Sequence, residues 1–128
     1  MSNTKILSYQ ENPITFGIGK DVWVNATEMA KPFRKLPKDF LRQQSIIEYM
    51  DLLEKRKENP PIEKYSNILR IVQHGDAKLQ GTWMHQKLAL RFAQWLSPAF
   101  SLWVDDQIEE LLTTGSVSNE IPKDYPSA

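Results

Sequence analysis

The periodicity of the hydrophobic residues changes along the chain, and this change limits the fold more than any other feature. Three short runs rich in β-branched and aromatic residues, at 6–9, 14–16 and 21–24, are separated by Asn12-Pro13 and by the glycines at 17 and 19. Such runs with turn residues between them are typical of a small antiparallel meander. The pattern then becomes helical, so we expect an α+β fold.

Asn25 marks the expected start of the first helix. Its side chain can accept hydrogen bonds from the free backbone N–H groups of a helix end, and Glu28 follows three residues later, as in a capping box. We therefore predict a short helix over about residues 26–33. Pro37 is placed as a first-turn proline, so a second helix should run over about residues 37–57.

Turn residues in the middle of the chain indicate a hairpin after the second helix. Ser45 is a candidate break in that helix, and a polar connection with two prolines follows it at 58–67. Residues 68–73 and 79–84 are then expected to form two strands. Gly75 suits a turn between them that needs unusual backbone angles, so the hairpin should have a polar tip.

Two apolar helices should complete the domain. The first is marked by apolar residues at helical spacing, which are Met84, Leu88, Phe92, Trp95 and Leu96. Ser97-Pro98 is a start signal for the second, whose apolar residues are Phe100, Trp103, Val104, Ile108, Leu111 and Leu112. We expect one domain over 4–115 that ends at Gly115, a disordered polar tail over 116–128, and no folded unit after it. The tryptophans should belong to the core, and they are Trp23, Trp83, Trp95 and Trp103.

The net charge of zero conceals an uneven distribution. Residues 1–104 carry fifteen basic and ten acidic side chains, a net charge of +5. Residues 105–128 carry one basic and six acidic side chains, a net charge of −5. Because binding depends on the local field at the contact surface, the overall charge does not exclude a nucleic-acid partner.

A basic cluster surrounds the expected second helix. Its five cations lie within twelve residues that include one acid, Asp39, and they are Lys31, Arg34, Lys35, Lys38 and Arg42. The spacing of Lys35, Lys38 and Arg42 should place them on one helical face. Gln43 and Gln44 follow. Arginine and lysine pair with phosphate or guanine and glutamine matches adenine, so the cluster suits DNA. The alternative is an ordinary solvated helix face.

The expected hairpin carries a second polar group, consisting of Arg70, Gln73, His74, Lys78 and Gln80. Two short helices followed by a hairpin with a polar tip are the order of a winged helix-turn-helix. In that fold one helix enters the major groove and the wing contacts an adjacent groove or the backbone. The alternative is an ordinary surface hairpin.

Carboxylates and histidines raise the question of an enzyme. Metal-dependent nucleases bind magnesium through clustered carboxylates, and the last helix has four, which are Asp105, Asp106, Glu109 and Glu110. They lie opposite its apolar face, where solvated side chains belong, and no motif links them to a nucleophile or base. His74 and His85 have no cysteine partner and no ligand spacing. We therefore expect no catalytic residue, no metal and no cofactor.

Three segments resemble one protein family. Residues 22–30, Val-Trp-Val-Asn-Ala-Thr-Glu-Met-Ala, resemble the opening of the KilA-N domain, in which an aromatic-bearing strand runs into Asn-Ala-Thr. Gly81-Thr82-Trp83 resembles its Gly-Thr-Trp signature. Residues 95–100, Trp-Leu-Ser-Pro-Ala-Phe, resemble the run that follows. The three segments occur in the family's order over about residues 20–115.

This resemblance implies a winged helix-turn-helix-like fold, as in the related fungal APSES DNA-binding domains. Carried over by position, 25–33 would be the first helix of the unit, 37–44 the recognition helix and 70–80 the wing. Many relatives carry a tryptophan in the second helix, where this chain has Phe40-Leu41, so the helix register stays open. The resemblance also implies a phage- or prophage-type transcriptional regulator or an antirepressor-like module.

We therefore predict that the chain binds double-stranded DNA sequence-specifically, without a catalytic role, in the cytoplasm. The absence of cysteine fits a reducing compartment. The main alternative is a protein-interaction module in which the acidic helix over 98–113, or the basic helix, contacts a partner protein. A second alternative is a magnesium-dependent nuclease that uses the acidic helix.

Overall fold

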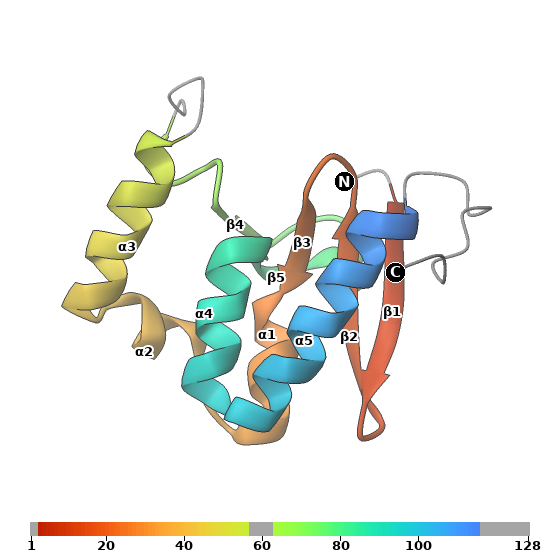
Figure 1. Cartoon of the computed structure of the whole chain (residues 1–128). Coiled ribbons are helices and arrows are strands. Elements are labelled where there is room, and N and C mark those ends of the chain that lie inside the picture. Colours follow the sequence, from red (N-terminus) through yellow and green to blue (C-terminus); the bar gives the residue numbers. More distant parts are fainter. Residues whose placement is uncertain (1–2, 57–62, 116–128) are drawn as a thin grey trace.

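The computed structural model describes residues 3–56 and 63–115, which form an antiparallel sheet packed against helices (Figure 1). The strands occur in the order β1-β2-β3-β5-β4 across the sheet, and they are β1 (Asn3–Tyr9), β2 (Asn12–Ile18), β3 (Val22–Asn25), β4 (Leu69–Val72) and β5 (Gly81–His85). All four strand pairs are antiparallel. The α+β fold predicted from the periodicity is confirmed.

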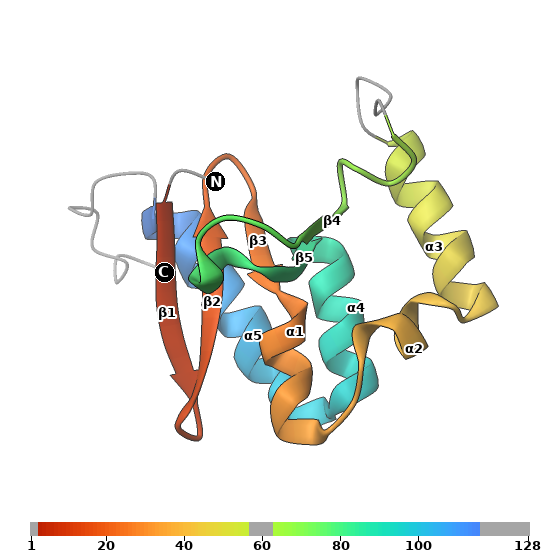
Figure 2. The same cartoon turned by 180° about the vertical axis from the view of Figure 1, so that it is seen from behind.

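The helices divide into two groups around the sheet. Those described are α1 (Ala26–Ala30), the 3₁₀ helix η1 (Lys31–Phe33), α2 (Pro37–Leu41), α3 (Gln44–Lys55), the 3₁₀ helix η2 (Ala77–Leu79), α4 (Gln86–Leu96), α5 (Pro98–Glu110) and the π-helical turn η3 (Leu111–Gly115). Figure 1 shows α4 and α5 in front of the sheet, with α2 and α3 to one side. Seen from behind, the β4–β5 connection lies on the opposite side of the sheet (Figure 2).

An aromatic cluster connects the helices to the core. The side chains of Phe16, Phe40, Phe92 and Phe100 are almost completely buried. The ring of Phe40 lies 5.0 Å from that of Phe92, centroid to centroid, and 5.7 Å from that of Trp95. Phe40 therefore fixes α2 against α4 through contacts typical of packed aromatic pairs. This anchoring sets which side of α2 faces solvent.

The predicted second helix is divided into α2 and α3, so the break considered near Ser45 is present. The break lies at Arg42 and Gln43 rather than at Ser45, since Gln43 is extended (φ −73°, ψ 138°) and α3 begins after it. An α-helix turns by about 100° per residue. In a continuous helix Phe40 would therefore point roughly 120° away from the apolar stripe that contains Ile46 and Met50. The break allows both apolar surfaces to be buried.

Two local predictions are only partly right. Asn25 caps α1, since its Oδ1 accepts from the backbone N–H of Glu28 at 3.1 Å. The Glu28 carboxylate accepts from the N–H of Thr15 at 2.6 Å, so it bonds β2 instead of completing a capping box. Met84 ends the expected strand and lies in β5, where it is paired with Val24 on one side and with β4 on the other, so it does not begin the helix that follows.

The other expected elements can be compared directly. The three-stranded meander, the hairpin and the Ser97 start signal are confirmed, and Ser97 Oγ accepts from the N–H of Phe100 at 3.2 Å. Trp83 is completely buried as expected, whereas the other three tryptophans are half-buried. Leu112 is exposed, contrary to its place in the apolar face. The tail over 116–128 and the first half of the connection at 58–67 lie outside the described residues.

A hydrogen-bonded pair holds α3 to the segment before β4. The Tyr65 hydroxyl donates to Asp51 Oδ1 at 2.6 Å, and Lys64 Nζ lies 3.6 Å from the same oxygen. The hydrogen bond to Asp51 raises the pKa of Tyr65 to about 12. The same bond lowers the pKa of the Asp51 carboxyl from its ordinary value of 3.8. The pair is therefore more stable when the phenol is neutral and the carboxyl ionised.

Candidate nucleic-acid interface

Hydrogen bonds join the hairpin to the start of α1. Asn25 Nδ2 donates to the carbonyl of Gln80 at 3.1 Å, and the N–H of Thr82 donates to Thr27 Oγ1 at 3.0 Å. Asn25 also caps α1, so one side chain holds both elements. The orientation of the hairpin relative to α1 is therefore set by residues of the Asn-Ala-Thr and Gly-Thr-Trp segments.

Gly81 makes this close approach possible. Its φ of +130° is a conformation that L-residues rarely adopt. A Cβ atom there would lie 3.0 Å from Asn25 Oδ1 and 3.2 Å from Thr27 Oγ1. Two residues later, Trp83 is buried and its Nε1 donates to the carbonyl of Leu79 at 2.8 Å. Gly81 thus allows the hairpin to lie close to α1, whereas Trp83 anchors the base of the hairpin.

The tip of the hairpin is an ordered turn with exposed polar side chains. Asp76 Oδ1 accepts from the N–H of Lys78 at 3.0 Å, which caps η2. Gln80 Nε2 donates to the carbonyl of Gly75 at 3.1 Å. The predicted tip residues Gln73, His74, Lys78 and Gln80 are all exposed. We use the name hairpin tip for residues 73–80.

Arg70 is exposed but held on β4, away from the tip in sequence. Its guanidinium carbon lies 4.8 Å from the centre of the Trp23 ring, and its Nε donates to the carbonyl of Ser66 at 3.1 Å. A cation over an aromatic face is attracted by the ring quadrupole. These contacts restrain Arg70, whereas Lys78 has an exposed side chain at the tip.

The basic segment, residues 31–42, is exposed but does not form one helical face. Its five cations are all exposed, and they are Lys31, Arg34, Lys35, Lys38 and Arg42. The prediction that the last three share a face is wrong, because α2 covers only Pro37–Leu41. Lys35 precedes this helix and its Nζ lies 4.4 Å from the centre of the Trp95 ring. Arg42 follows the helix and pairs with Asp39 at 3.1 Å.

Gln43 and Gln44 lie in a different setting from the one predicted. The expected recognition helix over 37–44 ends at Leu41, and Gln43 precedes α3. Gln43 is half-buried, and its Nε2 donates to the carbonyl of Phe40 at 3.3 Å. Gln44 is exposed at the first position of α3, with its amide 3.4 Å from Glu48 Oε2. Gln43 therefore lies in the break and Gln44 begins α3, so neither belongs to α2.

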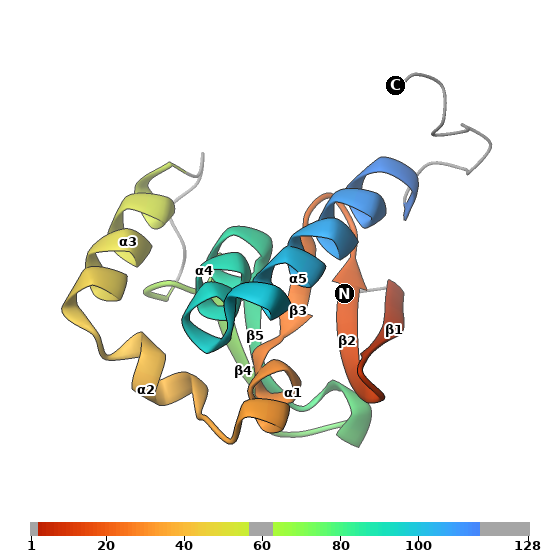
Figure 3. The same cartoon turned by 60° about the horizontal axis from the view of Figure 1, so that its bottom comes forward.

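The hairpin tip and the basic segment lie on either side of α1. In Figures 2 and 3, α1 lies between α2 and the turn that joins β4 to β5. Thr27 on α1 and Lys31 just after it are exposed. Thr27 was not expected as a site residue, and its bond to Thr82 joins positions 55 apart in sequence, which no local pattern indicates.

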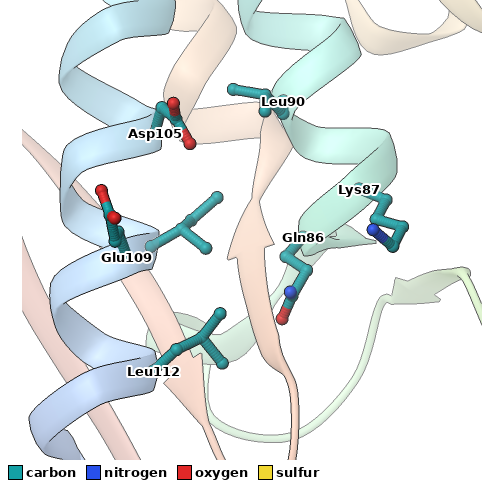
Figure 4. Close-up of a pocket in the computed structure, with 7 residues that line it drawn as sticks. Gln86, Lys87, Leu90, Asp105, Glu109 and Leu112 are labelled. Atoms are coloured by element: carbon teal, nitrogen blue, oxygen red, sulfur yellow. The ribbon is translucent and has the colours of Figure 1, made fainter.

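Two acidic residues of α5, Asp105 and Glu109, line a groove against α4. This groove has a volume of about 330 Å³, and Figure 4 shows Asp105 and Glu109 from α5 and Leu112 from η3 opposite Gln86, Lys87 and Leu90 from α4. Asp105, Asp106, Glu109 and Glu110 are exposed. Within the described ranges, no group of three or more carboxylate, histidine or cysteine side chains could hold a metal ion. The arrangement gives no support to the nuclease alternative.

The two histidines differ in environment. His74 is exposed at the hairpin tip, whereas His85 is buried between β5 and α4. His85 Nδ1 accepts from the N–H of Lys87 at 3.2 Å, and Nε2 lies 3.3 Å from Asp21 Oδ2. Because Nδ1 is an acceptor, a neutral ring carries its proton on Nε2, toward Asp21. His85 therefore caps α4 and has a structural role.

Comparison with known proteins supports the family resemblance. Residues 7–114 match the family model described as the KilA-N domain. Neither a curated protein nor a solved structure matches the chain. Among the helices of residues 3–56 and 63–115, none has the length and apolar character needed to cross a bilayer.

Proposed function

Because the chain belongs to the KilA-N family of DNA-binding domains, we propose that it binds double-stranded DNA sequence-specifically through the basic segment and the hairpin tip. The observation that carries this proposal is the exposure of five cations over residues 31–42, across α1 from a hairpin whose orientation is fixed to that helix. The separation of the two groups by α1 allows contact with two places on one duplex, as in a winged helix-turn-helix.

Different cations suit different parts of the duplex. Lysine, a point charge on a flexible stem, suits phosphate, so Lys35, Lys38 and Lys78 would position the domain. The planar guanidinium of Arg42 suits the paired acceptors of guanine. Its ion pair with Asp39 is exposed, 77% and 38% for the two side chains, and such pairs are weak enough for DNA to replace them.

The remaining predicted contacts follow from exposure. Gln44 is exposed at the start of α3 and can contact a base edge, whereas Gln43 is half-buried and would act by holding the break that orients Arg42. At the hairpin tip, Gln73 and His74 are free to contact DNA from the other side of α1. A DNA-bound domain of this kind would work as a phage- or prophage-type transcriptional regulator or antirepressor-like module in the cytoplasm.

Alanine variants test the proposal. Lys38→Ala should weaken binding to all duplexes alike and lower the salt slope by about one. Arg42→Ala should cost about 1–3 kcal/mol on a site selected from a random pool and relax selectivity at one base pair. Lys55→Ala, which removes an exposed cation at the end of α3, is the matched control and should change neither quantity.

The outcome at the hairpin tip separates two versions of the proposal. Recognition would belong to the hairpin tip if Gln73→Ala and Lys78→Ala lost binding. In that case Lys38→Ala and Arg42→Ala would keep full affinity and selectivity. The basic segment would then be a solvated surface. Unchanged binding in all four variants would refute the interface.

Protein interaction is the second candidate function, and the groove between α4 and α5 favours it. Leu90, Ile108 and Leu112 provide an apolar lining, and the two carboxylates of Asp105 and Glu109 outnumber the one cation, Lys87. This combination suits a peptide with both apolar and basic residues. Asp105→Lys with Glu109→Lys should abolish such binding and leave duplex binding intact, whereas loss of duplex binding would contradict this assignment.

A further inference from the structure

Leu36 is an exposed apolar side chain inside the basic segment. It is 52% exposed and belongs neither to the hydrophobic core nor to the partly buried residues around it. Its neighbours Lys35 and Lys38 are exposed cations, and Arg34 lies two residues before it. Leu36 therefore adds an apolar group to a surface that is otherwise basic.

The side chain of Leu36 forms no hydrogen bond that would cap α2. Leu36 occupies the N-cap position of α2 with an extended backbone (φ −122°, ψ 137°), the conformation favoured before Pro37. Serine or asparagine would satisfy an N–H group of the helix end, and they are preferred there for that reason. Leucine at this position violates a local rule, and such violations are expected at functional sites.

Other exposed apolar residues do not combine exposure with a helix-capping position. Ile6, Leu52, Ile71 and Leu102 are more exposed than Leu36, and single apolar residues on a surface are ordinary. Leu52, however, lies within α3, where leucine is a good helix former. Leu36 alone among these five occupies a position where a polar side chain would favour the fold.

The surrounding charges indicate the kind of surface that Leu36 would meet. Because Leu36 is exposed and lies between Lys35 and Lys38 in sequence, contact of the basic segment with DNA would bring its side chain to the surface of the duplex. The major groove presents one apolar group, the C5-methyl of thymine, which apolar side chains contact in sequence-specific complexes. Leu36 has no donor or acceptor, so it cannot take part in the hydrogen-bond readout.

We propose that Leu36 recognises a thymine methyl group in the major groove of the target site. This inference rests on the proposed function and adds to it a specificity-determining residue without charge. The contact is made by the side chain and does not use the backbone N–H groups of α2. It predicts that at least one base pair of the site is selected for a methyl group.

The test uses a duplex selected from a random pool by the unmodified protein, and copies in which each thymine is replaced in turn by uracil. Uracil lacks only the methyl group, so the minor groove and the base pairing are retained. At one position, replacement of thymine by uracil should weaken duplex binding by the parent about fourfold, as expected when one methyl group is no longer buried in the complex. The Leu36→Ser variant should bind the thymine duplex about tenfold more weakly than the parent does. Its own affinities for the thymine duplex and for the uracil copy should agree within about twofold.

Two controls separate recognition from folding. Leu52→Ser removes an exposed leucine from α3 and should keep the parent's affinity and its preference for thymine. Leu36→Ser gains a capping side chain while losing some apolar contact, so its melting temperature should stay within about 3 °C of the parent. A larger drop shows that Leu36 supports the fold and overturns the inference.

The remaining outcomes also decide the question. The inference would be overturned if Leu36→Ser bound the thymine duplex as tightly as the parent does. It would also be overturned if the variant preferred thymine over uracil as strongly as the parent does. The inference would also be overturned if Leu36→Ser bound every duplex more weakly while no replacement of thymine by uracil changed the affinity of the parent. If the pool enriches no sequence, this inference and sequence-specific binding both fail, while salt-sensitive binding to arbitrary duplex would still support general DNA binding.

Discussion

Substitution of Gly81 by alanine should disrupt the junction between the hairpin and α1. The φ of +130° costs alanine about 1–2 kcal/mol. The new Cβ, 3.0 Å from Asn25 Oδ1, must also displace the side chain that caps α1 and bonds the carbonyl of Gln80. Loss of a cap and of a hydrogen bond costs about 1 kcal/mol each. Gly81→Ala should therefore lower the free energy of unfolding by about 3–4 kcal/mol.

Gly75→Ala is the matched control for backbone strain. Gly75 also has a positive φ, +89°, but no atom lies within 4 Å of the position of its Cβ. This variant should lose only about 1–2 kcal/mol. Urea unfolding measures both values, provided that the m-value is unchanged. Equal losses in the two variants would refute the contact with Asn25 as the reason for glycine at 81.

Three further predictions concern the core, the titration of the Tyr65–Asp51 hydrogen bond and the basic segment. Trp83→Ala should cost about 3–5 kcal/mol in thermal or urea unfolding, and a parent-like stability would show that its site is not packed as described. The pKa of Tyr65 is about 12 in the folded chain and about 10 when unfolded. The stability from its bond to Asp51 is therefore complete below pH 10 and is lost as the pH rises toward 12. Tyr65→Phe should abolish this pH dependence of the free energy of unfolding, and the same dependence in the variant would refute the assignment to Tyr65. At the acid end the lowered pKa of Asp51 has the opposite sign, so its stabilisation is lost as the pH falls below 3.8. Asp39→Asn should tighten duplex binding about two- to fivefold, because it releases Arg42 and removes a negative charge, and weaker binding would show that the ion pair orients Arg42 for contact.

Elements that depend on neighbouring residues could be predicted from the sequence. The meander follows from alternation and turn residues, and the caps at Asn25 and Ser97 follow from local hydrogen bonding. The exposure of the predicted site residues, with Gln43 as a half-buried exception, follows from the cost of burying charged and amide groups.

Long-range packing explains the differences. The helix over 37–57 is broken because Phe40 packs on α4 while Ile46 belongs to another apolar stripe, and local helical preference does not contain that information. Met84 resembles a helix residue by spacing, but it is buried in a strand between two partners. The sequence also shows which cations cluster, whereas their separation from the hairpin tip by α1 is a property of the fold.

The salt dependence of duplex binding tests the central claim most directly. Three to five cationic contacts with phosphate should make log K fall against log salt with a slope of about −2.7 to −4.5, since each neutralised phosphate contributes about −0.9. Affinity for an arbitrary duplex should be weak, with a Kd on the order of 10⁻⁴ to 10⁻⁶ M at physiological salt. The measurement needs the unmodified protein and a labelled random duplex over a fourfold range of salt. A slope in the expected range supports contact through the basic segment and the hairpin tip, whereas binding that is absent or independent of salt would contradict it.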